Sequence, residues 1–312
     1  MDNQLREFIK SKERLDLKID YVFKKIFSKP ENNLELIEFL EAILHIKIVK
    51  IEIKNPELPK GYKDQKLGVL DIRAHINDDT IIDIEMQVSN GRTIVNRNLA
   101  YSSNIMAGQL QVGEFYKDIK TVISIVILAE NVFKRNSYLN EAKLIFTEPD
   151  PEYYVDMGYK GEEHILTEKL RYIYIELPKF LEKNPDMSTK LNQWLWLLVG
   201  REDMVKMASK ENKLIENVVE DLDTMSADEN ERFEAFKRKV AIWESNMLKQ
   251  EGLEEGEAKG RAEGRAEGRA EGRAEGEAKK QNEIAKKMKD EGAEIEFIVR
   301  VTGLTKEEVE AL

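Results

Sequence analysis

The sequence predicts an α/β fold built around a mixed sheet, and two observations lead to it. Segments with helical apolar spacing and short β-branched runs follow one another in the order α-β-β-β-α-β between residues 31 and 129. Asparagine, aspartate, glycine and proline mark the turns between these segments. Such an order excludes an all-helical protein and is typical of a core in which helices cover a sheet.

The first elements are a helix and a strand. Residues 31–44 carry leucine and isoleucine three and four residues apart, which predicts a helix. In residues 47–54, Ile51 and Ile53 alternate with charged residues, as in a half-buried strand. Prolines and a glycine indicate that residues 55–66 form a loop.

A hairpin is expected next. Residues 67–76 and 80–88 are two β-branched runs, and Asn77–Asp79 is a turn-forming segment between them. A helical pattern follows from Arg92 to about residue 112, and residues 121–129 are a further strand, too short to cross a bilayer.

Additional strands and helices are expected beyond residue 131. Residues 143–147 and 172–177 are interpreted as strands, and the segments from 191 to about 250 as helices. Trp194 and Trp196 are interpreted as core residues, with stacking on a nucleobase as the alternative.

The segment 251–280 is a tetrapeptide repeat. Glycine recurs at every fourth residue from 252 to 276, and Arg-Ala-Glu-Gly occurs four times from Arg261. In a helix this pattern places like charges four residues apart, and each glycine costs about 1 kcal/mol relative to alanine. A flexible spacer or a marginal helix is therefore predicted. The alternative is a homo-oligomer that associates across a Gly/Ala seam.

In the last thirty or so residues, 281–312, the spacing of apolar residues predicts a small helical module. Its final turn starts with a Thr305–Glu308 capping box. It is either a helix-turn-helix DNA reader or a packing module. The chain is thus divided into an α/β domain (1–200), a helical extension (201–250), the repeat linker (251–280) and the C-terminal module (281–312).

Composition restricts the chemistry. The chain has no cysteine, which excludes disulfides, thiolate zinc sites and cysteine nucleophiles. Its N-terminus is charged and has no apolar signal region, so a soluble cytoplasmic protein without a membrane partner is expected. The net charge is −11, but residues 1–100 hold 17 Lys+Arg and 17 Asp+Glu. A nucleic-acid face in this part of the chain is therefore allowed.

Polar residues share one face of the strand 80–88. Side chains alternate along a strand, so Asp83, Glu85 and Gln87 point one way, and pairing through the turn can bring Asp71 close to Glu85 or Gln87. Two converging carboxylates suit Mg²⁺, which prefers hard oxygen ligands and keeps several waters. The alternative is a hairpin with an ordinary polar face.

The motifs VLDIR and DIEMQ, on the second and third strands of this order, resemble the PD-(D/E)XK nuclease superfamily. The closer likeness is to the recombination-promoting nuclease (Rpn) group, also called PD-(D/E)XK nuclease family transposases. Further stretches match that group in order: KIDYVFKKIFS with ELIEFLEAIL, RNLAYSSNIMAGQLQVGEFYKD, TVISIVIL and IYIELPKF. The resemblance covers roughly residues 15–200. It implies a restriction-endonuclease-like αβββαβ core, followed here by a helical region and a helical C-terminal tail.

The resemblance also implies roles for particular residues. Metal binding falls to Asp71 and Glu85, with the carbonyl of Met86 as a further ligand. Gln87 stands where most of the superfamily has lysine. Glutamine can orient water by hydrogen bonding but brings no charge. It agrees with the Rpn group's own pattern, so the resemblance implies that Gln87 is a catalytic residue.

Four other residues match the family pattern or lie beside it. Asp20 is a third metal ligand or supporting acid, with the alternative that it caps a short helix at 21–27. Arg97 and Tyr101 lie one helical turn apart and are expected to support the site or contact DNA. Lys24 is a candidate phosphate contact, with a solvated face as the alternative.

The function implied is a Mg²⁺-dependent DNA endonuclease, with Mn²⁺ as a substitute metal. Such a hydrolase cleaves phosphodiester bonds in recombination or in defence against foreign DNA. The alternative is a non-catalytic DNA-binding or oligomeric regulator on a nuclease scaffold, which Gln87 and the overall acidity favour.

Overall fold

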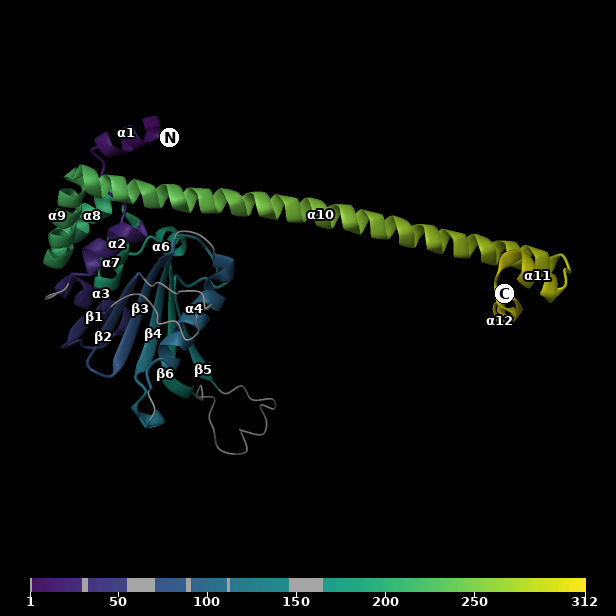
Figure 1. The fold of residues 1–312 in the computed structure, drawn as a ribbon, viewed down its shortest axis with the longest axis horizontal. Coiled ribbons are helices and arrows are strands. Elements are labelled where there is room, and N and C mark those ends of the chain that lie inside the picture. The colour runs from purple at the N-terminus through teal and green to yellow at the C-terminus, as the bar shows by residue number, and fades with distance from the viewer. Residues whose placement is uncertain (1, 30–32, 55–70, 88–90, 111–112, 146–164) are drawn as a thin grey trace. The chain divides into compact units, whose positions relative to one another are not determined.

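The computed structural model describes residues 2–29, 33–54, 71–87, 91–110, 113–145 and 165–312 (Figure 1). The chain forms two compact units, Met1–Trp243 and Glu244–Leu312. The expected loop at 55–66, and parts of the segments expected at 67–76, 80–88 and 143–147, lie outside the described residues.

A six-stranded mixed sheet forms the centre of the first unit (Figure 1). Its strands lie in the order β1-β2-β3-β4-β6-β5. The first three strands are antiparallel, β3, β4 and β6 are parallel, and β5 is antiparallel to β6. The bounds are β1 Ile51–Lys54, β2 Ile72–Ile76, β3 Thr80–Gln87, β4 Thr121–Leu128, β5 Leu139–Ile145 and β6 Ile165–Glu176. The predicted αβββαβ order and mixed sheet are confirmed.

The predicted hairpin is formed by β2 and β3. Ile76 pairs with Thr80, and the register runs to Ile72 opposite Ile84. Asn77 and Asp78 take left-handed backbone conformations with φ of 50° and 63°, which asparagine and aspartate tolerate better than other non-glycine residues. The Asn77 side chain also bonds the neighbouring segment, because its Nδ2 donates to the Lys47 carbonyl at 2.8 Å.

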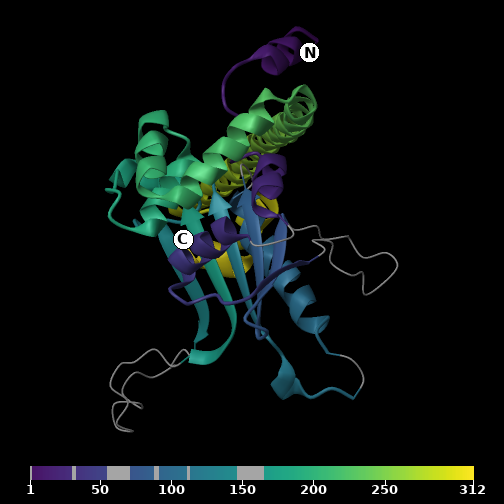
Figure 2. The same cartoon turned by 90° about the vertical axis from the view of Figure 1, so that its left-hand side faces the viewer.

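Helices lie on both sides of the sheet (Figure 1). Those of the first unit are α1 Asp2–Lys10, α2 Asp20–Phe27, α3 Leu34–Leu44, α4 Gly91–Ala107, α6 Leu177–Lys183, α7 Lys190–Val199, α8 Glu202–Glu211 and α9 Lys213–Ala227, with a 3₁₀ turn, η1, at Tyr116–Asp118. The helix α10, Glu229–Asp290, begins in this unit, and Figure 2 shows its first turns beside α1. There Phe8 and Phe236 lie with ring centroids 5.4 Å apart.

The main hydrophobic core lies between the sheet and α2, α3, α7 and α9. Ile82, Ile84 and Met86 of β3 point into it. Trp194 and Trp196 are fully buried there, and the Trp194 ring packs 5.8 Å from the Phe39 ring. Their interpretation as core residues is therefore confirmed, and buried rings are not available to stack on a nucleobase.

The opposite face of the sheet is covered by α4. Smaller apolar clusters hold this helix, one around Ile81, Ile105 and Val122 and one around Ile94 and Tyr174. Polar side chains lie between these clusters, so the α4 face of the sheet combines apolar packing with buried hydrogen-bonding groups.

The tetrapeptide repeat is helical in the structure, as part of α10. Within it, Arg261 pairs with Glu257 four residues earlier at 3.2 Å, which is the favourable orientation for such a pair. The repeat glycines have open space around them. Whether this segment acts as a spacer or as a self-association seam stays a prediction, as do the boundaries at residues 200, 250 and 280.

In the second unit, the end of α10 packs with α11 (Ile295–Thr302) and α12 (Lys306–Ala311) around Ala285, Ile298 and Val309. The predicted capping box of Thr305 and Glu308 is present. Among the described segments, no helix combines the length and apolar character needed to cross a membrane.

Candidate active site

Two carboxylates meet at the end of the β2–β3 hairpin. Asp71 directly precedes β2, and the register of Ile72 opposite Ile84 continues to Asp71 opposite Glu85. Asp71 Oδ2 accepts a hydrogen bond from the backbone N–H of Met86 at 2.7 Å. The antiparallel pairing therefore brings Asp71 and Glu85 together, as the strand pattern predicted.

Arg97 of α4 connects Glu85 to Gln87. Its Nη2 donates to Glu85 Oε2 at 2.6 Å and also to Gln87 Oε1. The Glu85 side chain is 6% exposed and the Arg97 side chain 34%. A nearly buried carboxylate is thus neutralised by a guanidinium that still reaches solvent, a charge-assisted bond of the stronger kind.

The electrostatics of this site favour a bound cation. Burial raises the pKa of Asp71 to about 7, and the charges of Glu85 and Asp20 add to this rise. Burial also raises the pKa of Glu85, although the Arg97 charge opposes the rise. Buried carboxylates that repel one another gain most from a positive ion placed between them.

The donor set fits a hard divalent cation. The Met86 amide and Arg97 engage one oxygen of Asp71 and one of Glu85, and the second oxygen of each makes no hydrogen bond to a described residue. Two carboxylate oxygens, completed by water and a substrate oxygen, are a typical Mg²⁺ environment. No group of three His, Cys, Asp or Glu residues with metal-binding geometry occurs in the part of the chain that the structure describes.

Asp20 lies near this pair but has another partner. It is the first residue of α2, where its Oδ1 accepts the N–H of Tyr21 at 2.8 Å. Its carboxylate also binds Arg238 of α10, through Nε at 3.1 Å and through Nη2. The structure assigns the helix cap to Ile19, and a role of Asp20 as third metal ligand stays a prediction.

The remaining predicted residues are Tyr101 and Lys24. Tyr101 lies beneath Arg97, with the guanidinium carbon 6.0 Å from its ring centroid, and burial together with the Glu85 charge raises the pKa of its hydroxyl. Lys24 is half-buried on α2. Its neighbour Lys25 pairs with Glu231 at 3.0 Å.

A buried network of hydrogen-bonded side chains lies between α4 and the sheet, and the sequence patterns did not predict it. Ser124 Oγ donates to Asp83 Oδ2 at 2.8 Å and also contacts Asn98, whose Nδ2 donates to Tyr174 Oη at 3.2 Å. Asp83 is fully buried, so its pKa is raised well above the usual range. The available signal was Ser124, a lone hydroxyl within the aliphatic run of β4.

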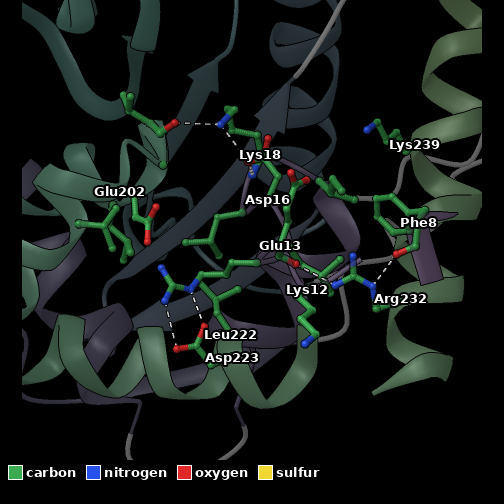
Figure 3. Close-up of a pocket in the computed structure, with 18 of the residues that line it drawn as sticks. Phe8, Lys12, Glu13, Asp16, Lys18, Glu202, Leu222, Asp223, Arg232 and Lys239 are labelled. Carbon is green, nitrogen blue, oxygen red and sulfur yellow. Dashed lines mark hydrogen bonds and ion pairs between the residues drawn. The ribbon is translucent and has the colours of Figure 1, made fainter. Parts of the chain in front are cut away.

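A cavity of about 900 Å³ lies elsewhere, between the N-terminal segment and α7–α10 (Figure 3). Its charges are largely satisfied within the fold. Arg14 forms a two-bond pair with Asp223, and the buried Arg232 donates to the carbonyls of Phe8, Glu13 and Ser226. None of its described lining residues is Asp71, Glu85 or Gln87. This cavity is therefore separate from the Asp71–Glu85 site and lies where the N-terminal segment packs on the helices.

Fold and site together define an α/β domain of the nuclease type. The family model of the PD-(D/E)XK nuclease family transposases matches residues 17–252. The chain belongs to this family, and the predicted resemblance is confirmed. No curated protein and no solved structure matches the chain. PD-(D/E)XK nucleases generally use divalent metals.

Proposed function

We propose that the protein is a Mg²⁺-dependent DNA endonuclease of the Rpn/transposase-like group that hydrolyses phosphodiester bonds in the cytoplasm, in recombination or in defence against foreign DNA. The observation that carries this proposal is the convergence of Asp71 and Glu85 on adjacent strands, each with one oxygen oriented by a protein donor. Family membership supplies the reaction class.

Asp71 and Glu85 would hold the metal, with the Met86 carbonyl as a further donor. A bound Mg²⁺ or Mn²⁺ supplies a water of lowered pKa and neutralises charge on the phosphate. Gln87 can orient the attacking water through its side-chain amide, because Arg97 engages only its Oε1 atom.

Arg97 accounts for the departure at Gln87. A lysine at this position would bring a positive charge beside the attacking water, and glutamine does not. Since the Arg97 guanidinium is bonded to the Gln87 amide oxygen, it delivers a charge to the same place from α4. We therefore assign to Gln87 and Arg97 together the work that lysine does in most of the superfamily.

The test is a cleavage assay on plasmid and linear DNA with EDTA, Mg²⁺, Mn²⁺ or Ca²⁺. The wild-type protein should nick or cut with Mg²⁺ or Mn²⁺ and be inactive in EDTA. Asp71→Ala and Glu85→Ala should abolish cutting while circular dichroism and thermal melting remain those of a folded protein. Full activity in either variant contradicts the assignment.

The second candidate is a non-catalytic DNA-binding or oligomeric regulator on the same scaffold. It is favoured by the ion pairs that already engage Glu85 and Asp20, with Arg97 and Arg238 respectively. DNA binding that is independent of metal, without cleavage in any of the three metals, would select it. Association through the 251–280 repeat belongs to the same set of proposals.

A further inference from the structure

The loop 129–138 joins β4 to β5. Backbone hydrogen bonds hold both of its ends at the edge of the sheet where Glu85 and Gln87 lie. It begins where the Ala129 N–H donates to the Gln87 carbonyl at 3.0 Å. It ends where the Glu176 N–H donates to the Tyr138 carbonyl at 2.8 Å. The loop therefore starts beside a predicted catalytic residue and crosses the carboxyl end of β6.

A buried ion pair holds this loop. The fully buried Glu176 carboxylate accepts the N–H groups of Val132 at 2.7 Å and Phe133 at 3.1 Å. Lys179 Nζ donates to Glu176 Oε2 at 2.5 Å and to the Phe133 carbonyl at 2.6 Å. Burying two charges is costly unless their hydrogen bonds are satisfied, and here the loop backbone satisfies them.

This ion pair explains a stretch to which no function has been given. Glu176 and Lys179 are the charged residues of IYIELPKF, one of the stretches that resemble the family. They do not reach the Asp71–Glu85 pair. Apart from the ion pair between them, the contacts just described go to the backbone of the loop, so the stretch acts as a clamp on residues 132 and 133.

The clamp sets the face on which the loop lies. Glu85 is in register with Val126, and Val126 with Tyr174, so these three residues share the α4 face of the sheet. The Phe133 ring packs on Tyr174 with centroids 4.9 Å apart and a T-shaped geometry. The next residues therefore emerge on the same face and at the same end as Glu85.

Those next residues are Lys134 and Arg135. Both are exposed, and neither forms an ion pair with any residue that the structure describes. The end of β6 is two strand spacings, roughly 10 Å, from β3. A duplex bound at Asp71 and Glu85 is wider than this separation, so its backbone is within reach of both cations.

We infer that the clamped loop is a DNA-backbone contact, in which Lys134 and Arg135 bind phosphates beside the scissile position. The inference rests on the proposed function for its ligand. Two adjacent exposed cations suit a polyanion, and a fixed loop loses little conformational entropy when it binds. The contact is sequence-independent, because phosphates carry no base information.

The test measures binding of a short fluorescein-labelled duplex by anisotropy in EDTA, across about 50–200 mM KCl. The Lys134→Gln/Arg135→Gln double variant should bind more weakly at low salt. Its slope of log K against log [KCl] should be smaller than that of the wild type by about 1.8, since each duplex phosphate contact contributes about 0.9. The assay uses the full-length protein.

A matched control removes two exposed lysines near the amino end of β4. They are Lys117 of η1, which precedes this strand, and Lys169 of β6, next to Leu170, the partner of Val122. The Lys117→Gln/Lys169→Gln variant has the same change of charge and should keep the wild-type slope. Equal slopes for wild type and loop variant overturn the inference, and so does an equal loss in the control. If the wild-type protein does not bind DNA, both this inference and the proposal that DNA is the substrate are wrong. A wild type that binds but does not cut, with the slope reduced in the loop variant, supports the inference and rejects only the proposed catalysis.

Discussion

Arg97 and Glu85 form an ion pair across the interface of α4 and β3, with 2.6 Å between Nη2 and Oε2. The same nitrogen bonds Gln87, so one guanidinium group orients both polar residues at the carboxyl end of the strand. Burial of the Glu85 side chain raises its pKa, and the charge of Arg97 opposes this rise.

Removal of the Arg97 charge should reduce catalysis. Arg97→Gln is expected to lower kcat by roughly 10²-fold, the usual loss for one electrostatic stabilising group. Arg97→Lys keeps the charge but replaces the guanidinium, whose Nη2 reaches both acceptors, with an ammonium on a shorter side chain. Its kcat should fall between those of wild type and Arg97→Gln. Single-turnover cleavage at saturating metal measures both. Wild-type rates in Arg97→Gln would show that its charge is not used.

A lysine restored at the superfamily's usual position should not help on its own. In Gln87→Lys the new ammonium lies against the Arg97 guanidinium, and like charges at that distance repel. We expect lower activity than wild type. The double variant Gln87→Lys/Arg97→Gln removes the repulsion and should recover part of the rate. If the single variant is more active than wild type, Arg97 does not replace the lysine charge.

The raised pKa of Asp71 predicts how stability depends on pH without metal. Its folded value is about 7 and its ordinary value 3.8. The stability that the protonated Asp71 carboxyl contributes is therefore fully present below about pH 4 and is lost as the pH rises to 7 and above. The loss is at most about 4 kcal/mol.

Asp71→Asn should remove this loss, since the amide oxygen can still accept the Met86 N–H. In urea titrations with EDTA, the variant should become more stable relative to wild type between pH 4 and pH 7. Addition of Mg²⁺ should cancel the difference by stabilising only the wild type. A constant difference across this pH range would contradict the pKa of Asp71.

The sequence predicts the structure best where the regular spacing of apolar and polar residues determines which side chains are buried. The β2–β3 hairpin, the polar face of Glu85 and Gln87, and the buried tryptophans all follow from alternation or helical spacing. Interactions between distant segments could not be predicted in this way. Nothing near Asp20 indicates its bond to Arg238, which is 218 residues away, and nothing in IYIELPKF indicates that it binds residues 132 and 133.

The repeat 251–280 shows that local helix propensity alone does not predict whether a segment is helical. Glycine content and like charges four residues apart predict a weak isolated helix, whereas the structure places the repeat inside α10. Helix formation is cooperative, so a segment of low intrinsic propensity can be helical when helical turns already exist at both of its ends.

The Glu176–Lys179 pair should be strongly non-additive in stability. Glu176→Gln or Lys179→Met alone leaves one charge buried without its counter-charge, which should cost about 3–5 kcal/mol. The double variant removes both charges and should cost less than either single change. Urea unfolding of the full-length protein tests this. Additive losses would indicate two independent contacts.

Shortening the repeat should leave the first unit unchanged. Deletion of two Arg-Ala-Glu-Gly units removes eight residues of α10, or about 12 Å of helix. Cleavage by the variant should be unaltered, because Asp71 and Glu85 belong to the first unit and the repeat to the second. Light scattering then decides the role of the repeat. A change in molar mass supports association, and an unchanged mass supports a spacer.

The turn at Asn77 and Asp78 has a consequence for insertions and deletions. A short exposed turn is normally where a protein family tolerates a gained or lost codon. Here the turn fixes the register of β2 against β3, and a shift of one residue would move Glu85 to the opposite side of the sheet, into the apolar core. Its length should therefore be under strong purifying selection, although the turn lies at the far end of the hairpin from Asp71.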